Sequence, residues 1–378
     1  RLREVEIINS YHAVSPALYA QPDMEKHFRL NTFMVSTKSK ELVQRDRADY
    51  IPCQVSDYPK LFSQGILPLD AALIQVSPPD DEGNCSLGIS VDYTLAAALN
   101  APLVIAEMNE RMPYTLGESC IHISRIDYIV ESNRPLLTLP PPEIGPAERR
   151  IGSYVAGLIP DGATLQIGLR AIPESILQAL GDKRDLGVHS GMISDGIVDL
   201  ILKGVVNNTK KPINQGVTVT PCLMGTEKLY NFVHKNPLIG LYPITYTHDL
   251  TILSVLKDLI SINSALQVDL SGQVNAESLG LMQISGVGGQ LDFVRAANIT
   301  PGGKSIIALK SVTNNGKSRI VPFLARGAAV PTPRHDIRYL VTEYGVAELW
   351  GKNLRQRREA LLAISHPDCR DDILKEYE

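Results

Sequence analysis

Short apolar runs alternate with helical patterns along this 378-residue chain. Continuous apolar runs bounded by turn residues are typical of buried parallel strands, and apolar positions about 3.6 residues apart are typical of helices. The predicted strands are 5–11, 28–35, 50–55, 71–76, 103–107, 121–130, 164–167, 186–189, 217–223, 306–309, 320–323 and 339–342. The predicted helices are 36–47, 58–62, 92–99, 147–159, 173–180, 197–206, 226–234 and 354–364, and a further helix follows the glycines 286–289 and runs to about 297. Residues 259–270 and 273–281 are predicted to pair as strands around the turn Ser271-Gly272.

A proline-rich stretch divides this series in two. Five prolines lie between residues 134 and 148, where the alternation of strands and helices stops before it resumes. Such a stretch is typical of a linker, and alternating strands and helices are typical of an α/β fold with a parallel sheet. We therefore predict two successive open α/β domains, over residues 1–137 and 149–378, joined by a linker over residues 138–148.

The composition is that of an ordinary globular protein, and it narrows the range of partners. Hydrophobic residues make up 44% of the chain and charged residues 21%, and the net charge of −4 comes without a long basic run. Nucleic acid and membrane surfaces are therefore not expected as partners, and no apolar stretch is long enough to span a bilayer. The five cysteines are scattered, so we expect reduced thiols in a cytoplasmic protein. No group of residues has metal-ligand spacing, and no metal is expected.

Two glycine turns lie where a strand is predicted to lead into a helix. Gly286, Gly288 and Gly289 precede Gln290 in the first, and Gly168-Leu169-Arg170 forms the second. Turns without side chains let backbone N–H groups approach an oxyanion or phosphate, although a tight turn without a ligand fits the pattern equally well. In the second turn the arginine could bind a carboxylate or phosphate, or it could be a solvated surface residue.

The stretch from His189 to Gly196 joins a predicted strand to a predicted helix. In open α/β sheets ligands bind at this edge. His189 is interpreted as a structural histidine, with a general base as the alternative. Asp195 most simply caps the following helix. Glu277 lies in a polar bend further along, where a surface carboxylate is the simplest interpretation and a catalytic one the alternative.

Several longer motifs occur in a fixed order along nearly the whole chain. They are Val76-Ser77-Pro78-Pro79-Asp80, Leu165-Gln166-Ile167-Gly168, His189-Ser190, Met192-Ile193-Ser194-Asp195-Gly196, Gln267-Val268-Asp269-Leu270, Ser285-Gly286-Val287-Gly288-Gly289-Gln290, Val341-Thr342-Glu343-Tyr344-Gly345 and Ala363-Ile364-Ser365-His366-Pro367-Asp368. Together they resemble one family, the acetyl-CoA hydrolase/transferase group, and especially its members of the 4-hydroxybutyrate CoA-transferase type.

This resemblance implies a fold of the NagB/RPIA/CoA transferase-like type, with acyl-CoA bound in a cleft between two similar α/β domains. It also implies a ping-pong reaction, in which a glutamate attacks the thioester and holds CoA as a glutamyl thioester until a small carboxylic acid collects it. Acyl-CoA and a small carboxylic acid are thus the expected substrates, without a permanently bound cofactor, and a homodimer is the expected assembly. Members usually carry a further strand–helix unit before Arg1, so we expect a segment to be missing there.

The resemblance breaks at the nucleophile. The pattern of these members places the glutamate inside a His-Ser-Glu-Met segment, and Gly191 has that position here. Glycine has no side chain that could attack a thioester. A CoA-transferase could take its carboxylate from elsewhere, with Glu277 the leading candidate, and this is the function we predict. An acyl-CoA hydrolase or lyase could instead use water or a substrate group in the vacated space, and a non-catalytic acyl-CoA-binding protein is the third possibility.

Arg170 also departs from the resemblance, because the family usually has glycine at that position. The predicted strands 164–167 and 186–189 should lie side by side, so that Arg170 and Gly191 face one cavity. We hypothesise that the two exchanges are coupled. The lost glutamate removes a negative charge, and the arginine then favours a carboxylate on the substrate. An Arg170 that turns outward beside an ordinary tight turn at Gly191 is the alternative.

Overall fold

The second half of the chain builds the largest sheet of the computed structural model, which describes residues 3–10 and 23–377. The strand order is β11-β10-β14-β19-β21-β22, and every neighbouring pair is parallel except the last. The parallel order confirms the predicted α/β class. The strands are β10 (Thr164–Ile167), β11 (Gly187–Val188), β14 (Leu259–Asn263), β19 (Lys304–Ala308), β21 (Tyr339–Thr342) and β22 (Gly345–Glu348).

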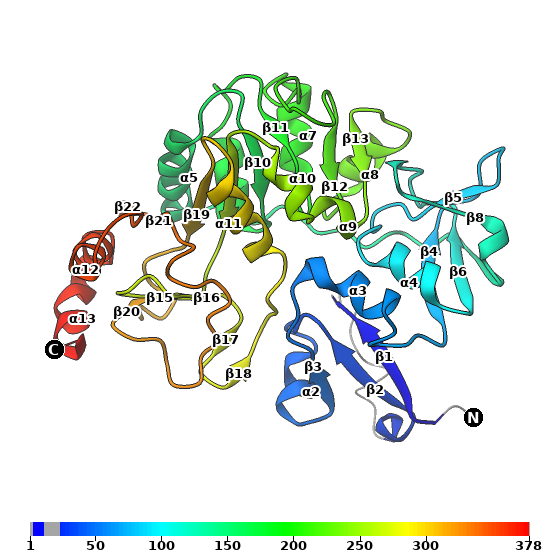
Figure 1. Cartoon of the computed structure of the whole chain (residues 1–378), viewed down its shortest axis with the longest axis horizontal. Helices are drawn as coiled ribbons and strands as arrows, with labels where there is room; N and C mark the ends of the chain where they lie inside the picture. Colours follow the sequence, from blue (N-terminus) through cyan, green and yellow to red (C-terminus); the bar gives the residue numbers. More distant parts are fainter. Residues whose placement is uncertain (1–2, 11–22, 378) are drawn as a thin grey trace.

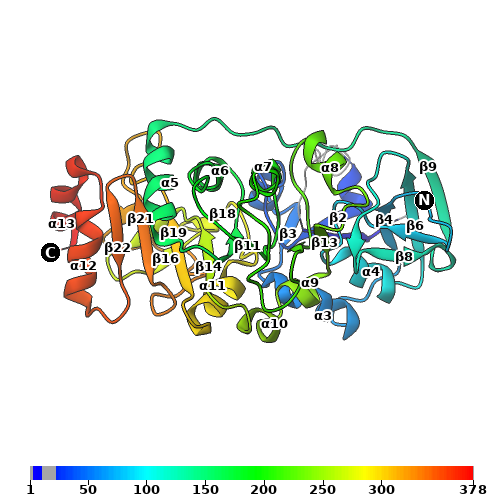
Figure 2. The ribbon, with the colours of Figure 1, turned by 90° about the horizontal axis from the view of Figure 1, so that it is seen from above.

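Helices cover both faces of this sheet (Figure 2), which explains why its inner strands are apolar on both sides. All four residues of β10 are buried, as this enclosure requires. One face carries α5 (Pro146–Leu158), α6 (Ala171–Gln178) and α7 (Asp195–Leu202), and the other carries α10 (Leu250–Ser254) and α11 (Gln290–Ile299). The carboxyl ends of β10 and β11 therefore open between these two layers, next to the start of α11.

The first half of the chain forms two smaller parallel sheets and a two-stranded antiparallel sheet (Figure 1). The parallel sheets are β1 (Val5–Asn9), β2 (Phe28–Thr32) and β3 (Ala48–Tyr50), and β4 (Ala72–Val76), β6 (Val104–Asn109) and β9 (Tyr128–Ser132). The antiparallel sheet pairs β5 (Asn84–Ser86) with β8 (Cys120–His122). The helices of this half are α2 (Lys40–Gln44), α3 (Tyr58–Ser63) and α4 (Thr94–Asn100).

The two halves are joined by strand pairing and by a common core. β7 (Leu116–Gly117) pairs with β13 (Ile239–Leu241), which pairs in turn with β12 (Thr218–Thr220). Val76 and Leu165 belong to one hydrophobic cluster that extends across the proline-rich stretch. The halves are therefore packed against each other along a continuous apolar contact.

The proline-rich stretch is extended and runs along one side of the molecule from β9 to α5 (Figure 2). Its backbone is held to the second half, because Leu139 N–H donates to Gly225 O at 2.8 Å and Tyr230 OH donates to Leu137 O at 2.7 Å. α8 (Glu227–Val233) supplies that tyrosine. The division of the chain into residues 1–137, 138–148 and 149–378 stays a prediction.

Most predicted elements are present, and one predicted strand is interrupted by a local side-chain hydrogen bond. The predicted strand 164–167 matches β10, and the predicted helix 354–364 matches α12 (Leu354–Ala363). The predicted strand 121–130 is broken after β8, because the His122 side chain accepts from Ser124 N–H and turns the chain before β9 begins. Local side-chain bonds of this kind compete with strand pairing and leave the apolar pattern unchanged. The end of the predicted strand 5–11 lies outside the described residues.

The predicted strand 259–270 is also divided. β14 joins the main sheet, whereas β15 (Gln267–Asp269) pairs antiparallel with β16 (Val274–Asn275) around Ser271-Gly272, as predicted for that turn. β15 also pairs with β20 (Ile320–Val321), and a second hairpin follows. The predicted strand 273–281 is divided between β16 and β17 (Ser278–Leu279). The elements that the pattern did not predict are α9 (Ile244–Thr247), β18 (Met282–Gln283) and α13 (Arg370–Tyr377), together with β5, β7, β13, β22 and α10. In the described part of the chain, no helix is long and apolar enough to cross a membrane.

Candidate active site

The chain leaving β11 crosses the carboxyl end of the main sheet. Ser190 Oγ donates to Ile167 O at 2.9 Å, which fixes this segment against the end of β10. A Cβ atom added to Gly191 would lie 3.1 Å from Nε2 of His248 and 3.6 Å from a ring carbon of Phe293. The nearest groups to Gly191 are thus an imidazole and an aromatic ring.

The turn 286–289 approaches the same imidazole from the other side. A Cβ atom at Gly289 would lie under 3.0 Å from Nε2 of His248, and one at Gly286 would collide with the carbonyl oxygen of Phe33. Real Cβ atoms do not come that close, so the ring and the turn can meet only because residue 289 is glycine. Gly191 and Gly289 therefore both approach the His248 ring.

The turn is also tied to the first half of the chain. Val55 N–H donates to Gly288 O at 3.2 Å, and Val35 N–H donates to Ser285 O at 3.3 Å. Gly288 has a φ of 63°, which side chains rarely adopt. The turn therefore lies where the two halves of the chain meet.

The turn leads directly into α11, whose first backbone N–H groups have no partner within the helix. The helix dipole adds partial positive charge at this end, so that negative charge in front of the turn is stabilised. The Gln290 side chain binds elsewhere, because its Nε2 donates to Thr332 Oγ1 at 2.9 Å. The backbone of the turn is therefore the part that can stabilise an oxyanion.

His248 is a site residue that the sequence did not indicate. It follows α9, is 4% exposed, and has its Nδ1 2.9 Å from Thr247 Oγ1. Burial disfavours the charged imidazole and lowers the pKa of His248 to about 3. The ring borders an open cavity of about 660 Å³, which Ser56 and Lys60 of the first half also line. A histidine beside an apolar run was the only signal available, and such a signal does not separate a site histidine from a core histidine.

Asp292 lies at the same cavity, in the first turn of α11. Ser56 Oγ donates to its Oδ1 at 2.9 Å, whereas its Oδ2 is buried without a hydrogen-bond partner among the described residues. Burial raises the pKa of Asp292 to about 6. The carboxyl group therefore carries an energetic cost when it is ionised, and it links α11 to the first half of the chain.

His189 is enclosed completely. Its Nε2–H donates to Thr247 O at 3.0 Å, and its Nδ1 has no partner among the described residues. Burial lowers the pKa of His189 to about 3. In this geometry the ring orders the segment that precedes His248 and does not reach the cavity, which agrees with a structural histidine better than with a base.

Glu277 is buried, so the surface interpretation of this residue is wrong. Tyr50 OH donates to its Oε2 at 2.6 Å, and Gln283 Nε2 donates to the same oxygen at 3.0 Å. Its backbone carbonyl accepts from Ile284 and Ser285 N–H, immediately before the turn 286–289. The carboxylate thus lies inside the protein, between the first half of the chain and the segment that carries the glycine turn.

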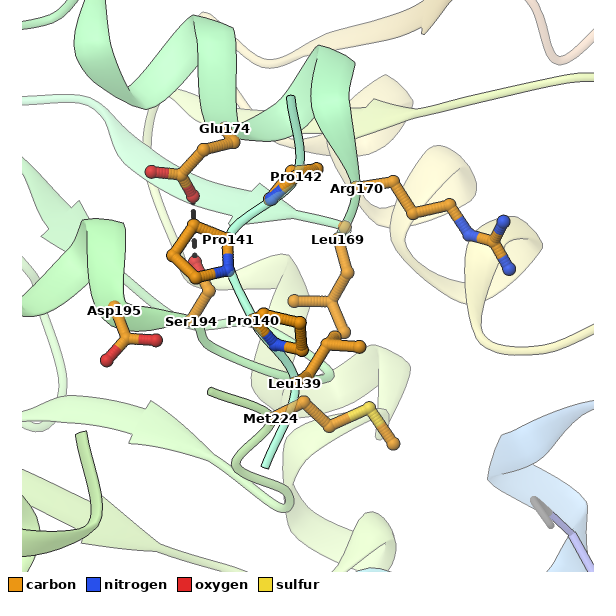
Figure 3. Close-up of a pocket in the computed structure, with 11 residues that line it drawn as sticks. Leu139, Pro140, Pro141, Pro142, Leu169, Arg170, Glu174, Ser194, Asp195 and Met224 are labelled. Carbon is orange, nitrogen blue, oxygen red and sulfur yellow. Dashed lines mark hydrogen bonds between the residues drawn. The ribbon is translucent and has the colours of Figure 1, made fainter. Parts of the chain in front are cut away.

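The second glycine turn lies elsewhere and is closed by the proline-rich stretch. It borders a small cavity of about 100 Å³ whose lining includes Leu139, Pro141 and Met224. Figure 3 shows the Arg170 guanidinium directed away from the prolines and from Glu174. Arg170 has a φ of 88° and a ψ of −171°, a conformation that favours glycine.

The helix that follows the His189–Gly196 stretch is capped differently from the prediction. Ser194, not Asp195, is the N-cap residue of α7. The Asp195 carboxylate instead accepts from the backbone N–H and the hydroxyl of Thr226 and from Leu229 N–H, and so it holds the start of α8. The described residues contain no cluster of three metal-ligating side chains.

The fold and the site define an α/β protein with a glycine turn at a helix N-terminus beside the carboxyl ends of parallel strands, which is where open α/β sheets bind ligands. The chain belongs to the acetyl-CoA hydrolase/transferase family. Residues 4–140 match the N-terminal domain of acetyl-CoA hydrolase/transferase, and residues 225–377 match the C-terminal domain. The family resemblance is thereby confirmed, and the chain is an enzyme of the CoA-transferase/hydrolase kind.

Named relatives cover nearly the whole chain. It is 51% identical to the 4-hydroxybutyrate coenzyme A transferase of Clostridium kluyveri, over 97% of this chain and 86% of that protein. It is 42% identical to the succinyl-CoA:cyclohexane-1-carboxylate CoA transferase of Geobacter metallireducens, over 99% and 86%. The structure resembles 4-hydroxybutyrate CoA-transferase of Porphyromonas gingivalis (TM-score 0.82, 39% identity, 99% and 93% covered) and RipA of Yersinia pestis (TM-score 0.92, 34% identity, 98% and 86% covered).

Proposed function

We propose that this protein is an acyl-CoA:carboxylate CoA-transferase of the 4-hydroxybutyrate/acetate type. The observation that carries the proposal is the similarity over nearly the full chain to proteins named as CoA transferases, among them a 4-hydroxybutyrate coenzyme A transferase at 51% identity. The site is consistent with it, because a glycine turn at a helix N-terminus suits the oxyanion that forms when a thioester is attacked. The substrates are acyl-CoA and a small carboxylic acid.

In this proposal the thioester carbonyl lies in front of the turn 286–289. The backbone N–H groups there stabilise the oxyanion of the tetrahedral intermediate, and the dipole of α11 adds to the effect. The cavity beside His248 leaves room for a large substrate body. Binding energy from parts of CoA that do not react can then position the thioester.

Glu277 is the proposed nucleophile, because Gly191 has no side chain. Both side-chain hydrogen bonds to Glu277 reach Oε2, so Oε1 is the oxygen left to attack. Attack on the thioester carbonyl forms a mixed anhydride and releases CoA thiolate. The thiolate then attacks the glutamyl carbonyl, releases the first acid and leaves glutamyl-CoA, and the acceptor acid reverses these steps.

Arg170 is the proposed contact for the carboxylate of the acceptor acid. It is exposed at the carboxyl end of β10, it has no ion-pair partner among the described residues, and its backbone conformation favours glycine. Backbone strain persists where function offsets its cost in free energy. Strain at a residue whose guanidinium is unpaired therefore favours a binding role for that residue. Coupling between Arg170 and Gly191 stays a hypothesis, and the nearest groups to Gly191 belong to His248 and Phe293.

We also propose a homodimer that works in the cytoplasm. The five cysteines are all free, in agreement with a reducing compartment. Leu73 on β4, and Tyr128 and Val130 on β9, are largely exposed on the first-half sheet β4-β6-β9, and a contiguous apolar surface of this kind suits association with a second copy.

Isotope exchange tests the transferase directly. Butyryl-CoA is incubated with deuterated acetate and the protein, and the products are analysed by mass spectrometry. The expected result is deuterated acetyl-CoA, together with a CoA adduct on the peptide that contains Glu277. Glu277→Gln, which can still accept from Tyr50, should lose the adduct. The absence of exchange with acetate, butyrate, succinate and 4-hydroxybutyrate, in protein that binds CoA, would contradict the proposal.

A further inference from the structure

His248 is the one ring that both Gly191 and Gly289 approach, and its orientation is fixed. Phe293 packs edge-on against it, with ring centroids 4.8 Å apart and an angle of 65°. Its Nδ1 lies 2.9 Å from Thr247 Oγ1. The ring therefore cannot turn its Nε2 away from the space in front of the glycine turn without losing both contacts.

The hydrogen bonds around Thr247 allow the proton of this ring to lie on Nδ1. The Thr247 hydroxyl can donate its single hydrogen to Pro243 O at 3.3 Å, and its oxygen then accepts from His248 Nδ1–H at 2.9 Å. In this tautomer the neutral imidazole has an unprotonated Nε2, since one ring nitrogen carries the proton and the other a lone pair. No hydrogen-bond donor to Nε2 is present among the described residues. The unprotonated nitrogen therefore lies beside Gly191 and is free to accept a hydrogen bond.

The glycine at position 191 keeps a side chain out of the place beside that nitrogen. A Cβ atom there would lie 3.1 Å from Nε2 and 3.3 Å from Cε1, and 3.1 Å is also a hydrogen-bond distance between a water oxygen and an imidazole nitrogen. The same place is beside the turn 286–289, where the proposed function puts the thioester carbonyl. A water molecule would therefore lie between a proton acceptor and an electrophile.

We propose that His248 is a general base that directs a water molecule, held in the space at Gly191, onto the acyl-CoA thioester, so that this enzyme hydrolyses acyl-CoA. The inference rests on the proposed function for the binding of acyl-CoA and for the place of its thioester carbonyl. Water loses a proton to Nε2, and its oxygen forms a bond to the thioester carbon. The C–S bond then breaks, and the leaving thiolate takes the proton from the imidazolium, which yields CoA thiol and the free acid.

The test measures hydrolysis of acetyl-CoA and butyryl-CoA without an acceptor acid, as release of CoA followed by chromatography. His248→Gln keeps a side chain of similar reach but cannot accept a proton, and we expect kcat to fall about 10²- to 10⁴-fold. The matched control His335→Gln, at an exposed position away from the cleft, should keep the wild-type rate. Imidazole added to His248→Ala should restore part of the activity, which a merely structural role for the ring would not produce.

A second, independent variant keeps the test valid if the His248 variants fail to fold. Gly191→Ala places a methyl group where the water is proposed to lie and should reduce hydrolysis at least tenfold, with CoA binding retained in calorimetry. In single turnover with water labelled with ¹⁸O, the label should appear in the product acid and not in the peptide that contains Glu277. A His248→Gln enzyme that hydrolyses at the wild-type rate, or label in that peptide, would overturn the inference.

The outcomes for hydrolysis and for transfer are separable. Hydrolysis that depends on His248 without deuterated acetyl-CoA formation would support this inference and contradict the CoA-transferase proposal. Formation of deuterated acetyl-CoA together with hydrolysis that is insensitive to His248→Gln would do the reverse. Protein that neither binds nor converts acyl-CoA would contradict both.

Discussion

The two glycine turns of this protein look alike in sequence and differ in surroundings. The turn at Gly168 is covered by the proline-rich stretch, and the guanidinium of Arg170 points away from its small cavity. The turn 286–289 instead meets the His248 ring, which also approaches Gly191 and which borders a cavity of about 660 Å³. Both turns precede helices and both offer backbone N–H groups.

The two glycine turns are therefore distinguished by the residues that pack in front of them. A Cβ atom at Gly168 would meet nothing closer than Pro173 Cγ at 3.9 Å, which is ordinary contact. A Cβ atom at Gly289 would collide with His248. The close approach of His248 therefore requires glycine at position 289. At position 168 the surrounding space would also admit a larger residue.

The largest expected effect comes from adding one methyl group to each turn. Gly289→Ala should lower kcat/KM for acyl-CoA conversion about 10²- to 10³-fold, because the methyl group displaces His248 and the oxyanion-binding backbone. Gly168→Ala is the matched control and should stay within about threefold of wild type. Steady-state kinetics measures kcat/KM for both variants. Equal losses at the two turns would show that they contribute alike and would end the distinction.

The next effect concerns the missing glutamate. Gly191→Glu alone should not yield rapid CoA transfer, because its Cβ would press on His248 at 3.1 Å. Removal of that ring in Gly191→Glu/His248→Ala should raise transfer at least tenfold over the single variant and produce a CoA adduct on residue 191.

Gly191→Glu/Arg170→Gly is the comparison variant, and it tests the coupling hypothesis. If Gly191→Glu/Arg170→Gly is the variant that gains CoA transfer, the charge of Arg170 limits transfer more than the space beside His248 does. Full activity in Gly191→Glu alone would contradict both accounts. Exchange of deuterated acetate and peptide mass spectrometry give the answer.

A smaller effect is expected in stability against pH, at Asp292 behind the second turn. Its pKa is raised from the ordinary 3.8 to about 6, so the folded state binds this proton more tightly than the unfolded chain does. The contribution of this group to stability is therefore complete below about pH 4 and is lost as the pH rises to about 6. The loss is on the order of 3 kcal/mol.

Asp292→Asn removes this proton equilibrium and can still accept from Ser56. Relative to wild type, the variant should gain unfolding free energy at pH 7 to 8 and should show no such gain near pH 4. Urea unfolding of the two proteins across this range measures the difference. A constant difference at every pH would show that burial of the charged carboxylate is not the cause.

The smallest effect is expected at Arg170. Arg170→Gly should raise the unfolding free energy by about 1 kcal/mol, because glycine adopts a φ of 88° without strain. If Arg170 binds the acceptor acid, KM for acetate should rise about tenfold while KM for acyl-CoA changes little. Calorimetric melting and exchange kinetics separate the two effects. An unchanged KM for acetate would leave strain without a binding role.

Local patterns in the sequence were sufficient for the framework of this protein. The apolar run of β10 and the glycine turn before α11 were predicted correctly, since each depends on neighbours within a few residues. The motifs placed the chain in its family, and they located Gly191 where a glutamate was expected. Each of these features lies within a short stretch of the chain, so it can be recognised without knowledge of the fold.

The tertiary structure alone decided which of these features form a site. Tyr50 and Glu277 are 227 residues apart in the chain, and His189 is 58 residues from the carbonyl that its ring contacts. Periodicity carries no information over such separations, because it reports which face of an element is apolar and not what covers that face. Only the packing of α9 and α11 against the end of β11 brought His248 to Gly191, and this contact is the reason to expect chemistry where the glutamate is missing.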